Sequence, residues 1–175
     1  IKQDEINTNC CGFIIENPVL IIEDKVKFKS FNKLVPLLVD RIDTQYLTNR
    51  TSFSTNKLED KSFLIIGCGS IGGYVFHNLI KSGCKNITIV DNDRMSAENI
   101  YRHFLGIESV GCYKTIALEK YAKNTISEIK IKSITKKIED AISDCKIELN
   151  DYDYIISATG NHIINLWLNK FIIDN

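Results

Sequence analysis

Apolar and polar positions follow two different periods in the larger, C-terminal part of the chain. Phe63–Ile66 is a continuous apolar run, which is typical of a strand buried on both faces of a parallel sheet. Apolar residues then recur at helical spacing as far as Gly83, which predicts a helix that stops there. The same patterns predict strands at 86–90, 129–134 and 152–158 and helices at 111–124, 139–145 and 161–173. This alternation predicts a Rossmann-like, doubly wound α/β fold with a mainly parallel sheet.

The N-terminal part has a different pattern. Residues 12–30 alternate short apolar runs with charges, which predicts a hairpin or two short strands. Residues 31–42 have apolar positions at helical spacing, with Pro36 near the start of the predicted helix. We therefore predict a small extension over 1–58 and a main domain over 59–175. Because this domain has only about four strands and the chain has no initial Met, we expect a piece of a longer protein, truncated on its C-terminal side.

The first predicted strand of the main domain runs directly into a glycine-rich loop. Residues 67–72, Gly-Cys-Gly-Ser-Ile-Gly, fit the pattern G-x-G-x-x-G between a strand and a helix. Gly67 suits a tight turn with positive φ, Gly69 allows close approach of a phosphate, and Gly72 allows the helix to pack on the strand. Together with Ser70, this turn presents free N–H groups and the positive end of a helix to an anionic ligand.

An acidic residue stands where a nucleotide-binding fold needs one. Asp91 lies nineteen residues after Gly72, at the end of the second predicted strand, and can accept hydrogen bonds from ribose hydroxyls. The combination predicts a nucleotide site, against the alternative that the glycines serve only tight packing. NAD in a dehydrogenase would suit the same loop and acid.

The segment after Asp91 favours a triphosphate. Asn99 and Arg102 are three residues apart, so one helical turn would place them on one face. Lys114 lies in the first turn of the next predicted helix. If these three side chains converge near the glycine loop, they can hold the β- and γ-phosphates of ATP and offset charge as pyrophosphate leaves. The alternative is that they are ordinary solvated surface charges.

The order of these motifs resembles a known family. Asp91-x-Asp93, Asn99-x-x-Arg102 and Gly111-x-x-Lys114 follow the glycine loop, as in the adenylation domain of the E1/ThiF/MoeB/HesA superfamily. The resemblance extends from residue 64 to residue 169. It implies adenylation of the C-terminal carboxylate of a ubiquitin-like or other protein by ATP and Mg²⁺. It further implies ribose binding by Asp91, phosphate contacts from Asn99, Arg102 and Lys114, and a place for Asp93 near the reacting phosphate or the metal.

Two further segments resemble a narrower group. Residues 102–106, Arg-His-Phe-Leu-Gly, and the region from Arg41 to Arg50 are similar to the E1 portion of bacterial E2–E1 fusion proteins, which act in antiphage CBASS defence. In relatives, an arginine before the first strand reaches the ATP of the partner subunit. The resemblance therefore implies a homodimer in which Arg50, or else Arg41, has that role.

One departure from the family pattern affects the metal. Gly160 stands near the position where the family often has an Asp that helps to hold Mg²⁺. Asp93 would then carry more of the metal site. Two alternatives stay open: a catalytically inactive E1-like scaffold, which Gly160 favours, and an NAD-dependent oxidoreductase. For His103, we expect a structural hydrogen bond rather than acid–base chemistry.

The charge composition gives no support for nucleic acid or an anionic membrane as a partner. Lys and Arg together number 22, as do Asp and Glu, so no net charge attracts nucleic acid or an anionic membrane. No basic stretch leads into an apolar core with a small-residue cleavage site, so we expect no signal peptide, and no apolar run is long enough to span a bilayer. The six cysteines have no C-x-x-C spacing, and two lie in the predicted nucleotide-binding core, so we expect reduced thiols in the cytoplasm.

Overall fold

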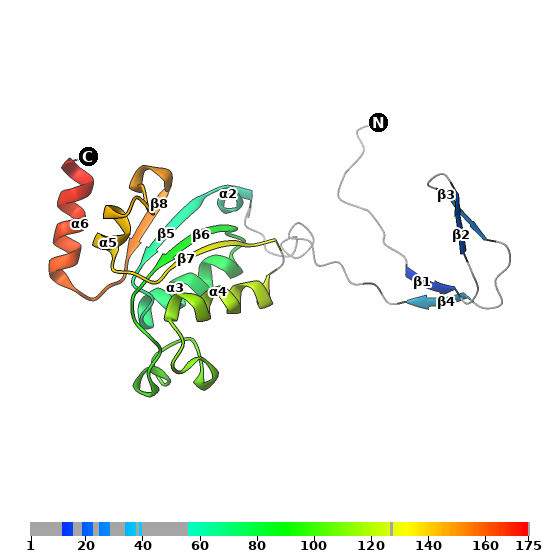
Figure 1. The fold of residues 1–175 in the computed structure, drawn as a ribbon, viewed down its shortest axis with the longest axis horizontal. Coiled ribbons are helices and arrows are strands. Elements are labelled where there is room, and N and C mark those ends of the chain that lie inside the picture. The colour runs from blue at the N-terminus through cyan, green and yellow to red at the C-terminus, as the bar shows by residue number, and fades with distance from the viewer. Residues whose placement is uncertain are drawn as a thin grey trace. The chain divides into compact units, whose positions relative to one another are not determined.

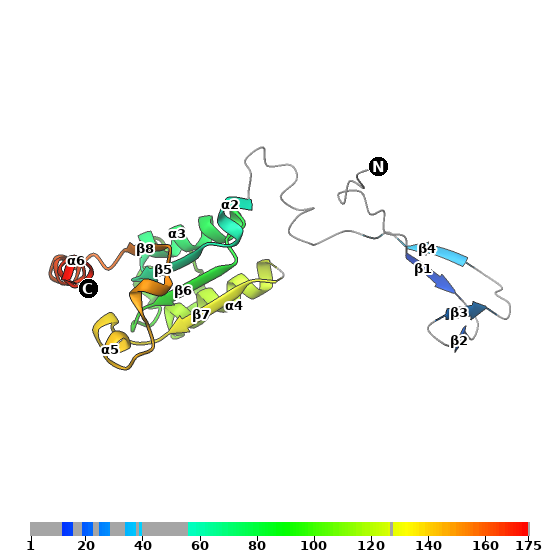
Figure 2. The same cartoon turned by 90° about the horizontal axis from the view of Figure 1, so that it is seen from above.

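The computed structural model describes residues 12–15, 19–22, 25–28, 34–37, 39, 56–126 and 128–174 (Figures 1 and 2). The chain divides into two compact units, residues 1–47 and 48–175. Helix α2, Asn56–Glu59, belongs to the second unit, so this division falls earlier in the chain than the boundary that we placed after residue 58.

The N-terminal unit contains two small antiparallel sheets. Strand β1 (Gly12–Ile15) pairs with β4 (Leu34–Leu37), and β2 (Val19–Ile22) pairs with β3 (Lys25–Phe28). The hairpin predicted within 12–30 is confirmed, but the helix predicted over 31–42 is wrong, because residues 34–37 form a strand. Pro36 explains the difference: it has no N–H for a helical hydrogen bond, whereas β4 has only one neighbouring strand and can accept a proline.

The second unit is built on a four-stranded parallel sheet. Its strands are β5 (Ser62–Ile66), β6 (Asn86–Val90), β7 (Lys130–Ile134) and β8 (Tyr154–Ser157), in the spatial order β7-β6-β5-β8. All three pairings are parallel. The predicted doubly wound α/β fold is confirmed, and because all pairings are parallel, the carboxyl ends of the four strands lie at one edge of the sheet.

Helices cover both faces of this sheet (Figures 1 and 2). Their bounds are Ser70–Lys81 for α3, Lys114–Thr125 for α4, Ile138–Ser143 for α5 and His162–Asp174 for α6. Short 3-10 turns occupy Ala97–Asn99, Ile107–Ser109 and Leu149–Asp151. The helices predicted for the main domain are confirmed, with α4 beginning three residues later than expected. Gly111, with φ of 85°, is part of the turn before it.

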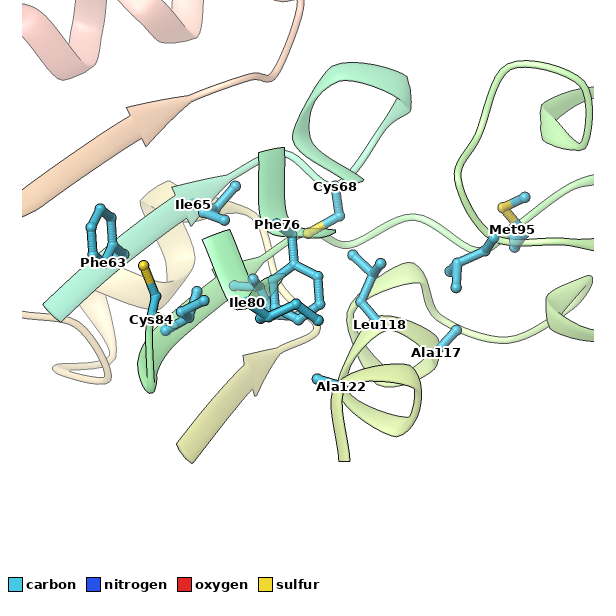
Figure 3. Packing of buried hydrophobic residues seen from close by; sticks show 13 residues of the cluster. Phe63, Ile65, Cys68, Phe76, Ile80, Cys84, Met95, Ala117, Leu118 and Ala122 are labelled. Carbon is cyan, nitrogen blue, oxygen red and sulfur yellow. The ribbon is translucent and has the colours of Figure 1, made fainter. Parts of the chain in front are cut away.

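The alternation of side chains along the strands separates two apolar clusters. Phe63 and Ile65 of β5 pack with Phe76 of α3 and Leu118 of α4 (Figure 3). The intervening residues of β5 and β6 pack with α5 and α6 on the opposite face; the buried members are Leu64, Ile66, Val90, Ile134, Ile138, Ala141, Ile147 and Leu168. Because β5 and β6 are covered on both faces, all of their buried positions except Thr88 are apolar.

Helix α3 ends just before Gly83, as the sequence pattern predicts. Gly83 has φ of 90°, its N–H donates to Ile80 O at 3.2 Å, and the N–H of Cys84 donates to Leu79 O at 3.1 Å. These two bonds form a Schellman motif, in which the glycine adopts the left-handed conformation that satisfies the last carbonyl groups. The chain then turns directly into β6.

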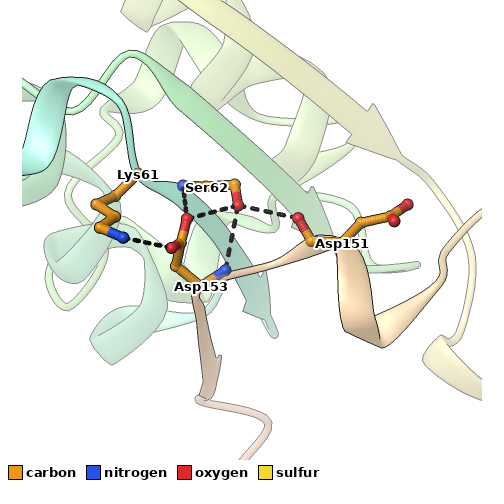
Figure 4. A network of polar contacts seen from close by, with 4 residues as sticks. All are labelled: Lys61, Ser62, Asp151 and Asp153. Atoms are coloured by element: carbon orange, nitrogen blue, oxygen red, sulfur yellow. Dashed lines mark hydrogen bonds and ion pairs between the residues drawn. The ribbon is translucent and has the colours of Figure 1, made fainter.

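A polar network joins the start of β5 to the segment before β8 (Figure 4). Asp153 accepts hydrogen bonds from Lys61 Nζ at 2.6 Å and from the Ser62 N–H at 2.8 Å. Ser62 Oγ donates to the carbonyl oxygen of Asp151 at 2.9 Å. The hydrogen bond from Lys61 is the main cause that lowers the pKa of Asp153 to about 2. The network lies at the amino ends of β5 and β8.

Helix α6 packs on the sheet with one side only. Leu168 is buried, whereas Ile163, Leu166 and Ile173 are exposed. Across the described residues, none of the helices combines the length and apolar character needed to cross a bilayer.

Candidate functional site

A cleft of about 260 Å³ opens at the carboxyl edge of the parallel sheet. Residues from the ends of all four strands and from α4, α5 and α6 line it: Ile66, Gly67, Gly69, Val90, Asp91, Asn92, Asp93, Lys114, Lys136, Lys137, Ile138, Glu139, Ala158, Thr159, Asn161 and Ile164. Ligands of open α/β sheets bind at this edge, because the loops that follow the strands converge there. The predicted glycine loop and both predicted aspartates lie in this cleft.

The glycine loop is held tightly on two sides. Gly67 has φ of 92°, and a Cβ there would lie 2.7 Å from the carbonyl group of Ala158. A Cβ at Gly72 would lie 1.9 Å from Gly67 O, because α3 begins directly against the end of β5. Both positions therefore require glycine for reasons internal to the chain, as predicted.

Gly69 differs from these two glycines. A Cβ at this position would meet nothing within 4 Å, so no contact within the protein demands a glycine there. Gly69 lines the cleft and is the N-cap of α3, which has no side-chain cap. The N–H groups of the first turn, which begins at Ser70, are thus left for a ligand, and the open backbone at Gly69 gives that ligand access.

Asp91 organises the loop from the neighbouring strand. Its Oδ2 accepts the Cys68 N–H at 2.6 Å, and its Oδ1 accepts the Asp93 N–H at 2.7 Å. Each carboxylate oxygen can accept more than one hydrogen bond, so the predicted ribose contact is compatible with these bonds. Burial raises the pKa of the Cys68 thiol well above its usual value, which keeps this residue protonated and unreactive.

Lys114 and Asp93 form an ion pair at the mouth of the cleft. Lys114 Nζ lies 2.9 Å from Asp93 Oδ2, and the Lys114 N–H donates to the Asp93 carbonyl oxygen at 3.0 Å. Lys114 is only 8% exposed, whereas the Asp93 side chain is 62% exposed. A buried ammonium with one carboxylate partner still has hydrogen-bond donors to offer, so a second anion can bind beside it.

Arg94 holds together the two ends of the loop formed by residues 94–113, which separates Asp93 from Lys114. Its Cζ lies 3.9 Å from the centre of the Tyr113 ring, and its guanidinium donates to Gly111 O at 2.7 Å. The N–H of Met95 donates to Cys112 O at 2.8 Å, so the two ends of the loop pair like short antiparallel strands. No sequence pattern predicts the role of Arg94, because an arginine in a polar loop has no distinctive spacing.

Asn99 and Arg102 lie outside the lining of the cleft. Asn99 Oδ1 accepts the Ser96 N–H at 3.2 Å as part of a capping box. Arg102 is exposed and has no side-chain partner among the described residues. The structure therefore brings Lys114, but neither of the other two predicted phosphate ligands, to the glycine loop. Their phosphate contacts stay predictions. Arg50 and Arg41 lie outside the described residues.

His103 connects the Asn99–Arg102 segment to the glycine loop. The Leu105 N–H donates to His103 Nδ1 at 3.0 Å, so Nδ1 carries the lone pair and Nε2 carries the proton. Nε2 then donates to Cys68 O at 2.7 Å. Burial lowers the pKa of His103, which favours this neutral form. The expectation of a structural hydrogen bond is confirmed.

The far side of the cleft contains polar residues that belong to no predicted motif. Lys136, Lys137 and Glu139 follow β7, while Thr159 and Asn161 follow β8. Lys136 pairs with Asp144, and this hydrogen bond raises the pKa of Lys136. The signal that could have found them is their position directly after predicted parallel strands, where loops reach the ligand-binding edge.

The residues at the cleft fit a magnesium ion that a nucleotide brings with it. The described part of the chain holds no group of three or more His, Cys, Asp or Glu that could bind a metal ion. Mg²⁺ usually takes one or two carboxylates and completes its shell with phosphates and water, and Asp93 can supply one carboxylate. Gly160, with φ of 65° and open space around it, supplies none.

The sequence relatives include bacterial proteins named as ATP-dependent and ubiquitin transferase-like. The chain is 32% identical over 140 residues to the ATP-dependent ubiquitin transferase-like protein Cap2 of Pseudomonas aeruginosa, covering 78% of this chain and 25% of that protein. It is 31% identical over 150 residues to Cap2 of Vibrio cholerae, covering 83% of this chain and 25% of that protein. The chain thus spans about a quarter of the length of these relatives.

Solved structures and a family pattern agree with these relatives. The structure of E. coli MccB with ATP is 28% identical with a TM-score of 0.59, covering 73% of this chain and 36% of that one. The structure of E. coli MccB with AMPCPP and MccA is 27% identical with a TM-score of 0.61, covering 74% and 36%. The ThiF family pattern matches residues 34–175. The chain therefore belongs to the ThiF family, which confirms the resemblance to the E1/ThiF/MoeB/HesA superfamily.

Proposed function

We propose that this chain carries the ATP-binding part of an E1-like adenylyltransferase. The single observation that carries the proposal is the cleft, in which the glycine loop, Asp91, Asp93 and the buried Lys114 come together at one edge of the sheet. The likeness to MccB with ATP supports ATP as the nucleotide. A triphosphate needs a cation beyond the glycine loop, and Lys114 provides one there.

In the proposed reaction, a carboxylate oxygen of the substrate attacks the α-phosphorus of ATP. A new oxygen–phosphorus bond forms, the bond between the α-phosphorus and the bridging oxygen breaks, and pyrophosphate leaves with its electron pair. The free N–H groups at the start of α3 hold phosphate oxygens, and Lys114 offsets negative charge on the departing group. Asp91 orients the ribose. The protein contributes positioning and charge stabilisation, with no proton transfer required.

Mg²⁺ would be held by the nucleotide phosphates, water and the Asp93 carboxylate, and would supply further charge neutralisation. Asp93 is already paired with Lys114, so both residues would act on the same phosphate groups. The Asp93 side chain is largely exposed, so its Oδ1 could face the metal while Oδ2 stays paired with Lys114.

The proposed substrate is the C-terminal carboxylate of a ubiquitin-like or other protein. The name of Cap2 and the presence of MccA in the MccB structure support a protein or peptide as the acceptor. We also propose a homodimer in which Arg50 reaches the partner's ATP, and a role in antiviral defence through the likeness to bacterial E2–E1 fusion proteins. Light scattering and the ATP affinity of Arg50→Ala test the homodimer: loss of affinity in a chain that still dimerises would support it.

The primary test is calorimetric titration of the chain with ATP–Mg²⁺ and, separately, with NAD. We expect binding of ATP and none of NAD. Lys114→Met should weaken ATP binding by about 10- to 100-fold, as expected for a lost charge-assisted bond, while AMP binding changes little. Binding of NAD alone would contradict the proposal and favour an oxidoreductase.

An inactive E1-like scaffold is a second candidate, and Gly160 is the observation that favours it. ATP–pyrophosphate exchange in the presence of a glycine-terminated ubiquitin-like protein distinguishes the two. Asp tolerates the left-handed conformation better than most residues, so Gly160→Asp should fold. Exchange by Gly160→Asp but not by the natural chain would support the scaffold.

A further inference from the structure

The loops along the cleft follow one another in the order of the strands in the sheet, and this order indicates where the base of a bound nucleotide lies. This inference rests on the proposed function, in which the ligand is ATP. The glycine loop follows β5 and takes the phosphates, whereas Asp91 follows the adjacent strand β6 and takes the ribose. Continuing in the same direction, the next strand is β7, which leads into α5. The base should therefore lie over the start of α5.

The start of α5 offers one apolar residue and three charged ones. Ile138 lines the cleft and is 3% exposed, so its side chain gives a flat base an apolar neighbour. Lys136, Lys137 and Glu139 line the same part of the cleft. Lys136 is occupied by Asp144, and Lys137 is exposed with no partner among the described residues.

Glu139 has an unused buried acceptor. Its Oε2 is buried and has no hydrogen-bond partner among the described residues. The other buried side-chain atom without a partner in that part of the chain is Thr115 Oγ1, and Thr115 does not line the cleft. An unpaired buried carboxylate oxygen is costly, so a group that can donate a hydrogen bond at this place would be bound favourably.

The chemistry of the Glu139 carboxylate determines whether the triphosphate or the base of the nucleotide can lie beside it. An ionised Glu only accepts hydrogen bonds and repels phosphates, so the triphosphate belongs at Lys114 and not at Glu139. Of the donors on ATP, the ribose hydroxyls lie at Asp91, which leaves the exocyclic 6-amino group of adenine. We propose that the Glu139 carboxylate accepts a hydrogen bond from this amino group and so determines the choice of base.

The test compares two nucleotides on three forms of the 175-residue chain. ATP and purine riboside 5′-triphosphate, which lacks the 6-amino group, are titrated with Mg²⁺ into the natural chain, Glu139→Ala and Asp140→Ala. Asp140 is the exposed neighbour that does not line the cleft and serves as the matched control. We expect the natural chain and the Asp140 variant to bind ATP about 10-fold or more tightly than the analogue, as for a hydrogen bond to a charged group. Glu139→Ala should bind both nucleotides equally.

Three results would overturn the proposed role of Glu139. An equal preference for ATP in Glu139→Ala and the natural chain overturns the inference and assigns base selection to other groups, while the proposed function stands. Tighter binding of GTP than of ATP by the natural chain also overturns it. If the natural chain binds neither ATP nor the analogue, both the inference and the proposed function fail. Glu139→Gln, which keeps the size and one acceptor oxygen, should show a reduced preference and replaces the Ala variant if that variant does not fold.

Discussion

The glycine loop and the Asn99–Arg102 segment carry motifs of the same family pattern, yet the structure treats them differently. In the glycine loop, contacts inside the protein determine the geometry, as the close approaches at Gly67 and Gly72 show. In the Asn99–Arg102 segment, Asn99 caps its own turn and Arg102 extends into solvent. One half of a nucleotide site can thus be preformed by packing, while the other half includes a side chain, Arg102, that no described residue holds in place.

The largest expected effect comes from Gly72→Ala. A Cβ there would lie 1.9 Å from Gly67 O, so β5 and α3 must separate. We expect a loss of at least about 3 kcal/mol of unfolding free energy, at the upper end of overpacking costs, and no ATP binding. Urea unfolding followed by circular dichroism measures the loss.

Gly69→Ala is the matched control for that substitution. It should leave unfolding unchanged within about 0.5 kcal/mol, because nothing lies within 4 Å of the new Cβ, while weakening ATP binding. Equal stability losses in the two variants would contradict our account of the loop.

Arg102→Met and Lys114→Met sharpen the comparison on the ligand side. Lys114 is buried beside Asp93, whereas Arg102 is exposed. If Arg102 turns to the triphosphate only on binding, its loss should weaken ATP affinity by up to about 10-fold, less than the loss of Lys114, because ordering a free side chain costs entropy. Calorimetric titration with ATP and AMP measures both. An Arg102 variant with unchanged affinity for ATP would remove this residue from the proposed site.

His103→Ala tests the link between the two regions. The variant loses the bonds to Cys68 O and to the Leu105 N–H, which should cost about 1–3 kcal/mol of unfolding free energy. His103→Asn, which can keep one bond, should lose less.

The natural chain should also depend on pH through His103. Its folded pKa is lowered, so below about pH 6.5, the ordinary value, the unfolded chain binds a proton that the folded chain resists. Stability should therefore fall as pH decreases through this range. A flat profile between pH 7 and pH 5 would contradict the assignment.

The smallest expected effects are those of substitutions at Arg94 and at Asp153. Arg94→Ala removes the contact with the Tyr113 ring and the bond to Gly111 O, and we expect a loss of about 1 kcal/mol. Thermal unfolding measures this loss, with Arg94→Lys as the control that keeps the charge. A larger loss of stability in Arg94→Lys than in Arg94→Ala would show that the contacts with the Tyr113 ring and Gly111 O are not the cause.

Asp153→Asn acts at the opposite edge of the sheet. The folded pKa of Asp153 is about 2, below its ordinary value near 4, so its contribution is present above pH 4 and is lost as pH falls toward 2. The variant should be slightly less stable at pH 7 and should lose less on acidification than the natural chain. ATP affinity should not change, because the network lies away from the cleft.

Local patterns predicted most of the main domain. The apolar run at 63–66 and the stop at Gly83 reflect forces that act over a few residues, namely burial on two faces and the left-handed turn after a helix. The strand at 34–37 was missed because a short apolar run has no period of its own, and its pairing partner lies some twenty residues earlier in the chain.

The candidate site was predictable where the backbone carries the chemistry. Gly67, Gly69, Gly72 and Asp91 act through turns and N–H groups whose places follow from the fold. The contributions of Arg94 and Glu139 depend on which loops meet after folding, and neither has a motif of its own. Side-chain direction at Arg102 could not be read from spacing, since an i, i+3 relation puts two residues on one face without saying what that face meets.

The hydrogen bond between His103 and Cys68 has a practical consequence. The His103 imidazole contacts the backbone of the glycine loop at Cys68 O and belongs to the loop that carries Arg102, so a change in either loop should alter the surroundings of its ring nitrogens. The ¹⁵N resonances of this single ring would thus serve as a built-in reporter of nucleotide occupancy, free of any attached probe. Titration with ATP, followed by these two signals, would reveal whether the glycine loop and the Asn99–Arg102 segment respond together or in succession.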